Sequence, residues 1–234
     1  MNWPGWYPPI LGYHRVHPQP ASDTPTLSPK VFDQQMKILA TRWNPISLQE
    51  LVSNLEKKRG LPSRAVVVTF DDGTEDNFTY AFPILLQYHI PATVFMISGN
   101  VGKPGSLSAE QILKMRRVGI HFGSHTVHHA YLPSLSIEQA RQELSDSKEA
   151  LQKLGLSVDF LSYPAGGFTS EIIQAVQETG YRGACTTNRG IRRFPPNPWA
   201  LRRISMHGNA ASSFEIWIRC CGYYGLNRRL RSPS

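Results

Sequence analysis

The sequence predicts one α/β domain built on a parallel sheet or barrel. Short apolar runs alternate with helical patterns at intervals of roughly 25 to 40 residues, which is the rhythm of βα units. The chain has 234 residues, a length at which α/β barrels commonly form one unit, and 41% of them are hydrophobic. The one proline-rich stretch, FPPNPW (194–199), is short and typical of a loop, so no linker divides the chain.

Six apolar runs are predicted to be strands. Each run is short and lies between helical patterns, as the strands of a parallel sheet do. In chain order they are ILGYHRV (10–16), AVVVTF (65–70), ATVFMIS (92–98), IHFGSH (120–125), DFLSYP (159–164) and YRGACTT (181–187).

Capping signals place helices between these strands. Ser47, Ser108 and Ser136 each precede a glutamate or glutamine by three residues, the capping-box pattern that begins a helix. Three glycines follow the last apolar residue of such a pattern and suit a left-handed C-terminal cap. These glycines are Gly119, Gly155 and Gly180.

Positive charge is concentrated near the C-terminus. Residues 182–234 contain ten arginines and a single acid, Glu215, whereas the whole chain has 25 Lys and Arg against 17 Asp and Glu. The formal charge of +8 therefore lies in this last quarter, which favours an anionic partner such as lipid head groups, a sugar phosphate or nucleic acid. A solvated surface without a partner is the alternative. Nucleic acid is the least favoured partner, because no recognisable nucleic-acid-binding motif is present.

We divide the chain into a barrel, residues 1–212, and a basic aromatic segment, residues 213–234. The segment combines arginines with Trp217, Tyr223 and Tyr224, a composition that suits the surface of an anionic membrane. A terminal helix packed on the barrel is the alternative. Because the sequence shows no signal peptide and no apolar run of about 18 residues, we expect a cytoplasmic protein, attached to the inner leaflet if the segment binds lipid.

The stretch VVVTFDDG (66–73) ends an apolar run on two adjacent carboxylates. Asp71 and Asp72 repel each other, and each resists ionisation while the other is charged. The Asp-Gly pair that follows is also a strong signal for a hairpin turn. The stretch therefore predicts either a hairpin or a site where a metal or a proton separates the two acids.

A second polar cluster, SHTVHH (124–129), ends another predicted strand. His125 and His129 are four residues apart, the spacing that places two imidazoles on one side of a helical turn, whereas His128 would point elsewhere. Functional groups gather where parallel strands end, so these histidines and an aspartate could bind one ion and leave positions open for substrate. Surface imidazoles without a ligand are the alternative.

The combination of TFDDG, SHTVHH and YPAGG (163–167) resembles the polysaccharide deacetylases of the NodB-homology type, also called carbohydrate esterase family 4. The resemblance spans roughly residues 8 to 206 and implies a distorted (β/α) barrel and a metal-dependent hydrolase that removes N-acetyl groups from an amino-sugar glycan. It implies that Asp72, His125 and His129 bind a divalent metal, usually zinc, with cobalt or nickel as alternatives. Asp71 is then the general base.

The remaining roles fall on residues that depart from the family pattern. The implied oxyanion donor is the backbone N–H of Ala165, where the family has the tyrosine of a PYG motif. GYHRV resembles the YHxV opening of a circularly permuted branch that includes biofilm poly-N-acetylglucosamine deacetylases, and this implies His14 as the general acid, with His207 as the alternative. Arg203, in LRRIS, resembles the arginine of LPRI in that branch and would pair with Asp71; a surface ion pair is its alternative role.

The altered third motif leaves other functions open. The barrel could have lost catalysis and bind glycans, or it could hydrolyse amides that are not sugars. Tyr163, beside the altered motif, could replace the missing aromatic wall or pack in the core.

Overall fold

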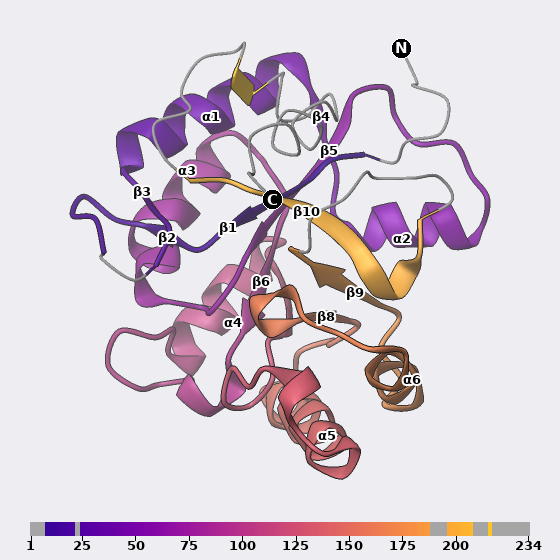
Figure 1. The fold of residues 1–234 in the computed structure, drawn as a ribbon. Helices are drawn as coiled ribbons and strands as arrows, with labels where there is room; N and C mark the ends of the chain where they lie inside the picture. The colour runs from indigo at the N-terminus through magenta and orange to yellow at the C-terminus, as the bar shows by residue number, and fades with distance from the viewer. Residues whose placement is uncertain (1–7, 22–23, 188–195, 208–214, 217–234) are drawn as a thin grey trace, which may run out of the picture.

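A closed barrel of parallel strands forms the centre of the computed structural model, which describes residues 8–21, 24–187, 196–207 and 215–216 (Figure 1). Seven strands follow one another in the order β1, β10, β9, β8, β7, β6, β5, and β5 pairs with β1 to close the barrel. Their bounds are β1 Ile10–Tyr13, β5 Ala65–Phe70, β6 Ala92–Met96, β7 His121–Ser124, β8 Phe160–Ser162, β9 Gly183–Thr186 and β10 Leu201–Ser205. The predicted α/β barrel is confirmed.

The first predicted strand, residues 10–16, is divided in the structure. After β1 the chain leaves the barrel at His14, and β2 (Arg15–Val16) pairs with β3 (Thr26–Leu27) in a separate small sheet. At this break the His14 carbonyl accepts a hydrogen bond from the Asn77 side chain at 2.9 Å. Outside the closed ring, β4 (Asn44–Pro45) extends the sheet beside the start of β5.

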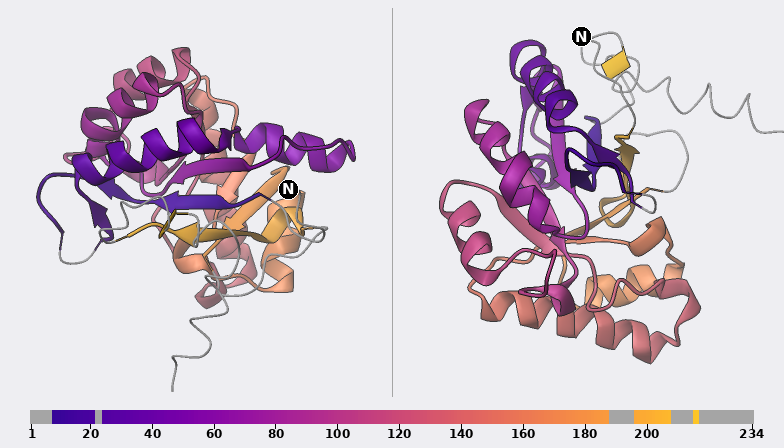
Figure 2. Two further views of the ribbon diagram at one scale, coloured as in Figure 1. Left: turned by 90° about the horizontal axis from the view of Figure 1, so that it is seen from above. Right: turned by 90° about the vertical axis from the view of Figure 1, so that its left-hand side faces the viewer.

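Helices surround the barrel on its outer side (Figure 2). Their bounds are α1 Pro29–Arg42, α2 Leu48–Glu56, α3 Phe82–Gln87, α4 Ala109–Arg117, α5 Ile137–Lys153 and α6 Ser170–Glu178. Ser108 and Ser136 form complete capping boxes, whereas Ser47 caps α2 through the N–H of Glu50 alone. The three glycines predicted to end helices all have φ between +79° and +93°. These helix ends follow from local chemistry, which a sequence displays directly.

Alternate residues of each strand face two different apolar clusters. In β5, Val66, Val68 and Phe70 join the cluster under the outer helices, whereas Ala65 and Val67 join a cluster inside the barrel. Leu48 of α2 belongs to the inner cluster, so α2 covers the barrel at the end where the strands begin. The opposite end, where the strands finish, is left open for polar groups.

The predicted boundary between residues 212 and 213 lies outside the described residues, and so does the basic aromatic segment that follows it, apart from Glu215 and Ile216. They stay predictions. Among the helices of the described part of the chain, none is long and apolar enough to span a bilayer.

Candidate active site and metal centre

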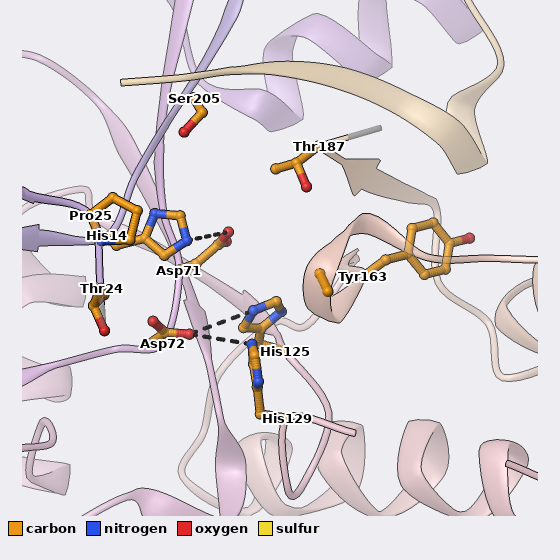
Figure 3. Close-up of a pocket in the computed structure, with 11 residues that line it drawn as sticks. His14, Thr24, Pro25, Asp71, Asp72, His125, His129, Tyr163, Thr187 and Ser205 are labelled. Carbon is orange, nitrogen blue, oxygen red and sulfur yellow. Dashed lines mark ion pairs between the residues drawn. The ribbon is translucent and has the colours of Figure 1, made fainter. Parts of the chain in front are cut away.

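A pocket of about 280 Å³ opens where the barrel strands finish (Figure 3). Its lining residues are His14, Thr24, Pro25, Asp71, Asp72, His125, His129, Tyr163, Ala165, Thr187 and Ser205. Except for Arg203, which lies behind Asp71, every residue assigned a catalytic or metal-binding role from the sequence lines this pocket. His207 is not among the described lining residues; its Nδ1 lies 3.2 Å from Ser205 Oγ.

The two aspartates occupy a tight turn at the end of β5. Asp71 continues the inward-facing row of the strand and is only 2% exposed. Asp72 has φ +71°, and the N–H of Gly73 donates to the Asp71 carbonyl at 2.9 Å, which closes a three-residue turn. Gly73 has φ +66°, and a side chain there would also meet Met96 Sδ at 2.3 Å, so any other residue would be strained and would displace the end of the Met96 side chain. The hairpin alternative is wrong, because every pairing of β5 is parallel.

Arg203 reaches Asp71 from β10 and forms a buried, two-pronged ion pair. Its Nη1 donates to Asp71 Oδ1 at 2.7 Å and its Nη2 donates to Oδ2 at 2.6 Å. Thr69 and Ser162 accept further hydrogen bonds from the same guanidinium. The pair is not on the surface, since the Arg203 side chain has no exposed area. Such a fork restrains both oxygens of the carboxylate.

The surroundings shift the pKa values of Asp71 and Asp72 in opposite directions. Burial alone would raise the pKa of Asp71, but the charge and the hydrogen bonds of Arg203 outweigh it and hold the pKa well below its usual range. Burial, followed by repulsion from Asp71, raises the pKa of Asp72 to about 6. Asp71 therefore stays ionised, and Asp72 is the acid that a nearby cation would stabilise.

The two histidines converge on Asp72. Asp72 Oδ1 lies 3.6 Å from His125 Nε2 and 3.7 Å from His129 Nε2, and one ligand atom from each residue lies within 4.8 Å of the others. His125 Nδ1 is 2.7 Å from the Ser162 carbonyl, so Nδ1 carries the proton and Nε2 offers its lone pair. Burial lowers the pKa of His125 to about 4, which keeps the ring neutral, as a metal ligand must be.

The loop that carries these histidines is not helical, so the helical-turn interpretation of their spacing is wrong. Thr126 and His129 instead adopt left-handed conformations with φ of +64° and +57°. Each such residue costs about 1–2 kcal/mol when it is not glycine. In this conformation the two imidazole rings lie next to each other, with their centroids 4.8 Å apart.

His14 lies beside Asp71, because it follows β1, which pairs with β5 up to the contact of Tyr13 with Phe70. Its Nε2 lies 3.9 Å from Asp71 Oδ2 (Figure 3). The flanking chain is held by Asp76, which is 6% exposed and accepts hydrogen bonds from Arg15 Nε at 2.7 Å and the Val16 N–H at 3.0 Å. Our sequence reasoning missed Asp76; a carboxylate three residues after the DDG glycine is the only signal that marks it.

Ala165 lies in a single 3₁₀ turn, Pro164–Gly166, at the pocket wall. The two hydrogen bonds of this turn are donated by the N–H groups of Gly166 and Gly167, not by that of Ala165. Ala165 has φ +52°, a strained conformation for alanine. Ala165 thus lines the pocket, and its backbone N–H donates neither of the two hydrogen bonds of the turn.

Tyr163 packs in the core instead of replacing the missing aromatic wall. Its ring lies against Phe168 with centroids 5.1 Å apart, and its hydroxyl donates to the Trp199 carbonyl at 2.9 Å. Figure 3 shows the ring turned away from the histidines. Sequence reasoning also missed Thr24, Pro25, Thr187 and Ser205, because a single threonine, proline or serine carries no distinctive pattern.

The fold and the pocket define a (β/α)-barrel protein with two acids and three histidines at the mouth of its barrel. Comparison with known proteins assigns its family. The family model for polysaccharide deacetylases matches residues 58–184, and YxkH of Bacillus subtilis is 32% identical over 90% of this chain and 75% of that protein. The chain belongs to the polysaccharide deacetylase family.

Two further relatives cover almost the whole barrel. The poly-β-1,6-N-acetyl-D-glucosamine N-deacetylase of Staphylococcus epidermidis is 30% identical over 89% of this chain and 81% of that protein. The structure of the Streptococcus pyogenes deacetylase PplD, in complex with acetate, matches with a TM-score of 0.84 at 29% identity, over 91% of this chain and 97% of that one. The three proteins carry the names of deacetylases, putative in the case of YxkH, and the Staphylococcus epidermidis protein is named an N-deacetylase.

Proposed function

We propose that this protein is a metal-dependent N-deacetylase that hydrolyses the acetamido group of an N-acetylated amino-sugar glycan. The convergence of Asp72, His125 and His129 beside a buried, ionised Asp71 is the observation that carries this proposal. The similarity to a poly-N-acetylglucosamine deacetylase supports the choice of substrate class.

The metal would be held by Asp72, His125 and His129. Two neutral imidazoles and one carboxylate suit zinc, and three protein ligands leave a position open for substrate. A divalent cation bound there supplies Lewis acidity, which polarises a carbonyl oxygen and lowers the pKa of water. The donor set fits, because both histidine Nε2 atoms face the same Asp72 oxygen.

Asp71 would act as the general base. Arg203 holds both carboxylate oxygens, yet each oxygen keeps a second lone pair that can accept a proton from the attacking water. Because Asp71 is ionised and is oriented by a buried fork, it would meet the water without a prior rearrangement.

His14 and Ala165 would complete the reaction. His14, whose Nε2 lies 3.9 Å from Asp71 Oδ2, would donate a proton to the departing amine, which is a poor leaving group until it is protonated. The N–H of Ala165 would donate a hydrogen bond to the oxyanion that develops from the acetyl carbonyl. In this proposal Asp71 would supply the base, His14 the acid and Ala165 the oxyanion donor of one pocket.

Removal of the metal is expected to abolish acetate release, and zinc to restore it. The assay uses short β-1,6-linked N-acetylglucosamine oligomers with chelator-treated protein, before and after addition of zinc. Because protons compete for the three ligands, zinc affinity should also fall as the pH drops below about 6, where Asp72 becomes protonated. Full activity without any divalent metal would contradict the proposal. Zinc binding without acetate release from these or related oligomers would instead favour a glycan-binding barrel.

The His14→Gln variant is expected to lower kcat for the glycan about 10²–10⁴-fold, the usual contribution of a general acid. The loss should be much smaller for p-nitrophenyl acetate, because p-nitrophenolate leaves without a proton. His207→Gln serves as the matched control, since His207 is not among the described residues that line the pocket. Equal losses on both substrates, or a larger loss for His207→Gln, would remove His14 from the acid role.

A further inference from the structure

A glutamate on the outer helix α5 binds the loop that carries the two histidines. Glu143 Oε2 accepts hydrogen bonds from the backbone N–H groups of Val127 at 2.9 Å and His128 at 3.1 Å. Its other oxygen, Oε1, accepts one from His128 Nδ1 at 2.6 Å. Only 14% of the glutamate side chain is exposed. One carboxylate thus holds the middle of the loop between His125 and His129.

A second contact from the same face of α5 holds the start of the loop. Ser147 lies one helical turn after Glu143, and residues four apart share a face of a helix. Its hydroxyl is 2.8 Å from that of Ser124, which in turn accepts a hydrogen bond from the Thr126 N–H at 3.2 Å. The loop is therefore attached to α5 at two successive points.

These contacts hold the backbone of the histidine loop in a strained conformation. The loop contains two left-handed residues that are not glycine, Thr126 and His129, and it has no regular hydrogen-bond ladder of its own. Two adjacent N–H groups that share one carboxylate oxygen form charge-assisted hydrogen bonds, which are stronger than neutral ones. Glu143 thus adds charge-assisted hydrogen bonds to the neutral ones that the carbonyls of Thr126 and Val127 accept from the N–H groups of residues 98 and 99.

We propose that Glu143 is a positioning residue that holds this loop in its metal-binding conformation before the metal arrives, and thereby sets the affinity of the site. The inference rests on the proposed metal site. A preformed loop binds an ion more tightly, because the cost of ordering the histidines is met during folding and not during binding. Residues that orient metal ligands typically change metal affinity 10–100-fold when they are replaced.

The same geometry assigns a minor role to His128, the third histidine of SHTVHH. Its ring is 75% exposed, and its Nδ1 is directed to Glu143 and not to Asp72. The two backbone hydrogen bonds of Glu143 do not depend on this ring. Removal of the His128 side chain should therefore leave the loop, and the metal affinity, close to those of the wild type.

The test measures zinc affinity by competition with a chromogenic chelator, together with the melting temperature of the metal-free protein. The variants are Glu143→Ala, Glu143→Gln and His128→Ala, and Glu149→Ala is the matched control, an exposed glutamate of α5 that pairs with Lys153. We expect the zinc Kd to rise 10–100-fold in Glu143→Ala and less in Glu143→Gln, whose amide oxygen still accepts N–H hydrogen bonds but carries no charge. His128→Ala and Glu149→Ala should bind zinc as the wild type does.

The outcomes separate this inference from the proposed function. If the wild type binds no zinc, the proposed metal site fails and the inference fails with it. If the wild type binds zinc and both Glu143 variants bind it equally well, only the inference is overturned, even when their melting temperatures fall. If Glu143→Ala does not fold, the result for Glu143→Gln decides. A loss in His128→Ala as large as that in Glu143→Ala would also overturn the inference, because it would show that His128 itself sets the affinity.

Discussion

The Asp71→Asn variant is expected to release acetate about 10²–10⁴ times more slowly than the wild type, while it keeps its affinity for zinc. The substitution replaces one carboxylate oxygen of Asp71 by an NH2 group, so the side chain becomes a neutral amide that does not take a proton from water. The three metal ligands, Asp72, His125 and His129, stay in place. Rate and zinc Kd are measured on the same preparation. This combination separates loss of the base from loss of the metal.

The control for Asp71→Asn is Glu75→Gln, which makes the same chemical change at an exposed position four residues away. It should have little effect on rate or zinc affinity. If Asp71→Asn retains most of the activity, another group takes the proton. If it loses zinc in proportion to activity, Asp71 contributes to metal binding and is not simply a base.

The Arg203→Met variant is expected to lose about 3–5 kcal/mol of stability, the usual cost when one partner of a buried ion pair is removed. Asp71 would be left as a buried carboxylate without its two strongest hydrogen bonds. Arg141→Met is the control, because Arg141 pairs with Glu178 on the surface, where ion pairs contribute about 0–1 kcal/mol. Urea denaturation of the metal-free proteins measures both changes.

The effect of Arg203→Met should depend on pH in a defined direction. In the wild type the pKa of Asp71 lies below its unfolded value, so the pair stabilises the fold above a pH of about 4 and loses this contribution as the pH falls toward the folded pKa. The difference in stability between wild type and variant should therefore shrink in acid. A difference that is unchanged from pH 7 to pH 3 would mean that the pair contributes through packing and not through charge.

A double variant tests whether Asp71 and Arg203 contribute to stability as a unit. When Asp71→Asn and Arg203→Met are combined, no buried charge remains at this position. Buried ion pairs replaced as a unit often cost little stability, so the double variant should be more stable than Arg203→Met alone. Acetate release should remain lost. Additive destabilisation would show that the two residues act independently.

Interactions between residues close in the sequence explain why the strands, the helix ends and the polar clusters could be predicted. The strands follow from short apolar runs that are buried on both faces, as in the fully buried β5. The helix ends follow from hydrogen bonds between residues three apart, such as the capping boxes at Ser108 and Ser136. The paired acids and the repeated histidines were visible because each group lies within a few residues of one strand end.

Contacts between distant segments explain what was missed. At the break the His14 carbonyl accepts a hydrogen bond from Asn77, 63 residues away, and the loop of His125 depends on Glu143 of α5. Neither contact leaves a periodic pattern in the chain. The helical interpretation of SHTVHH was wrong for the same reason, because restraints from α5 override the local spacing.

The sequence by itself determined the βα order, the positions of most helix ends and the residue types available at the strand ends, since these depend on burial and on hydrogen bonds between near neighbours. Only the tertiary structure decided which of those residues meet. The closure of β1 against β5 and β10 brings His14, Asp71 and Arg203 together, although Arg203 lies 132 residues beyond Asp71. The charge of a buried group depends on such long-range neighbours, and for this reason Asp71 and Asp72, adjacent in the chain, have pKa values shifted in opposite directions.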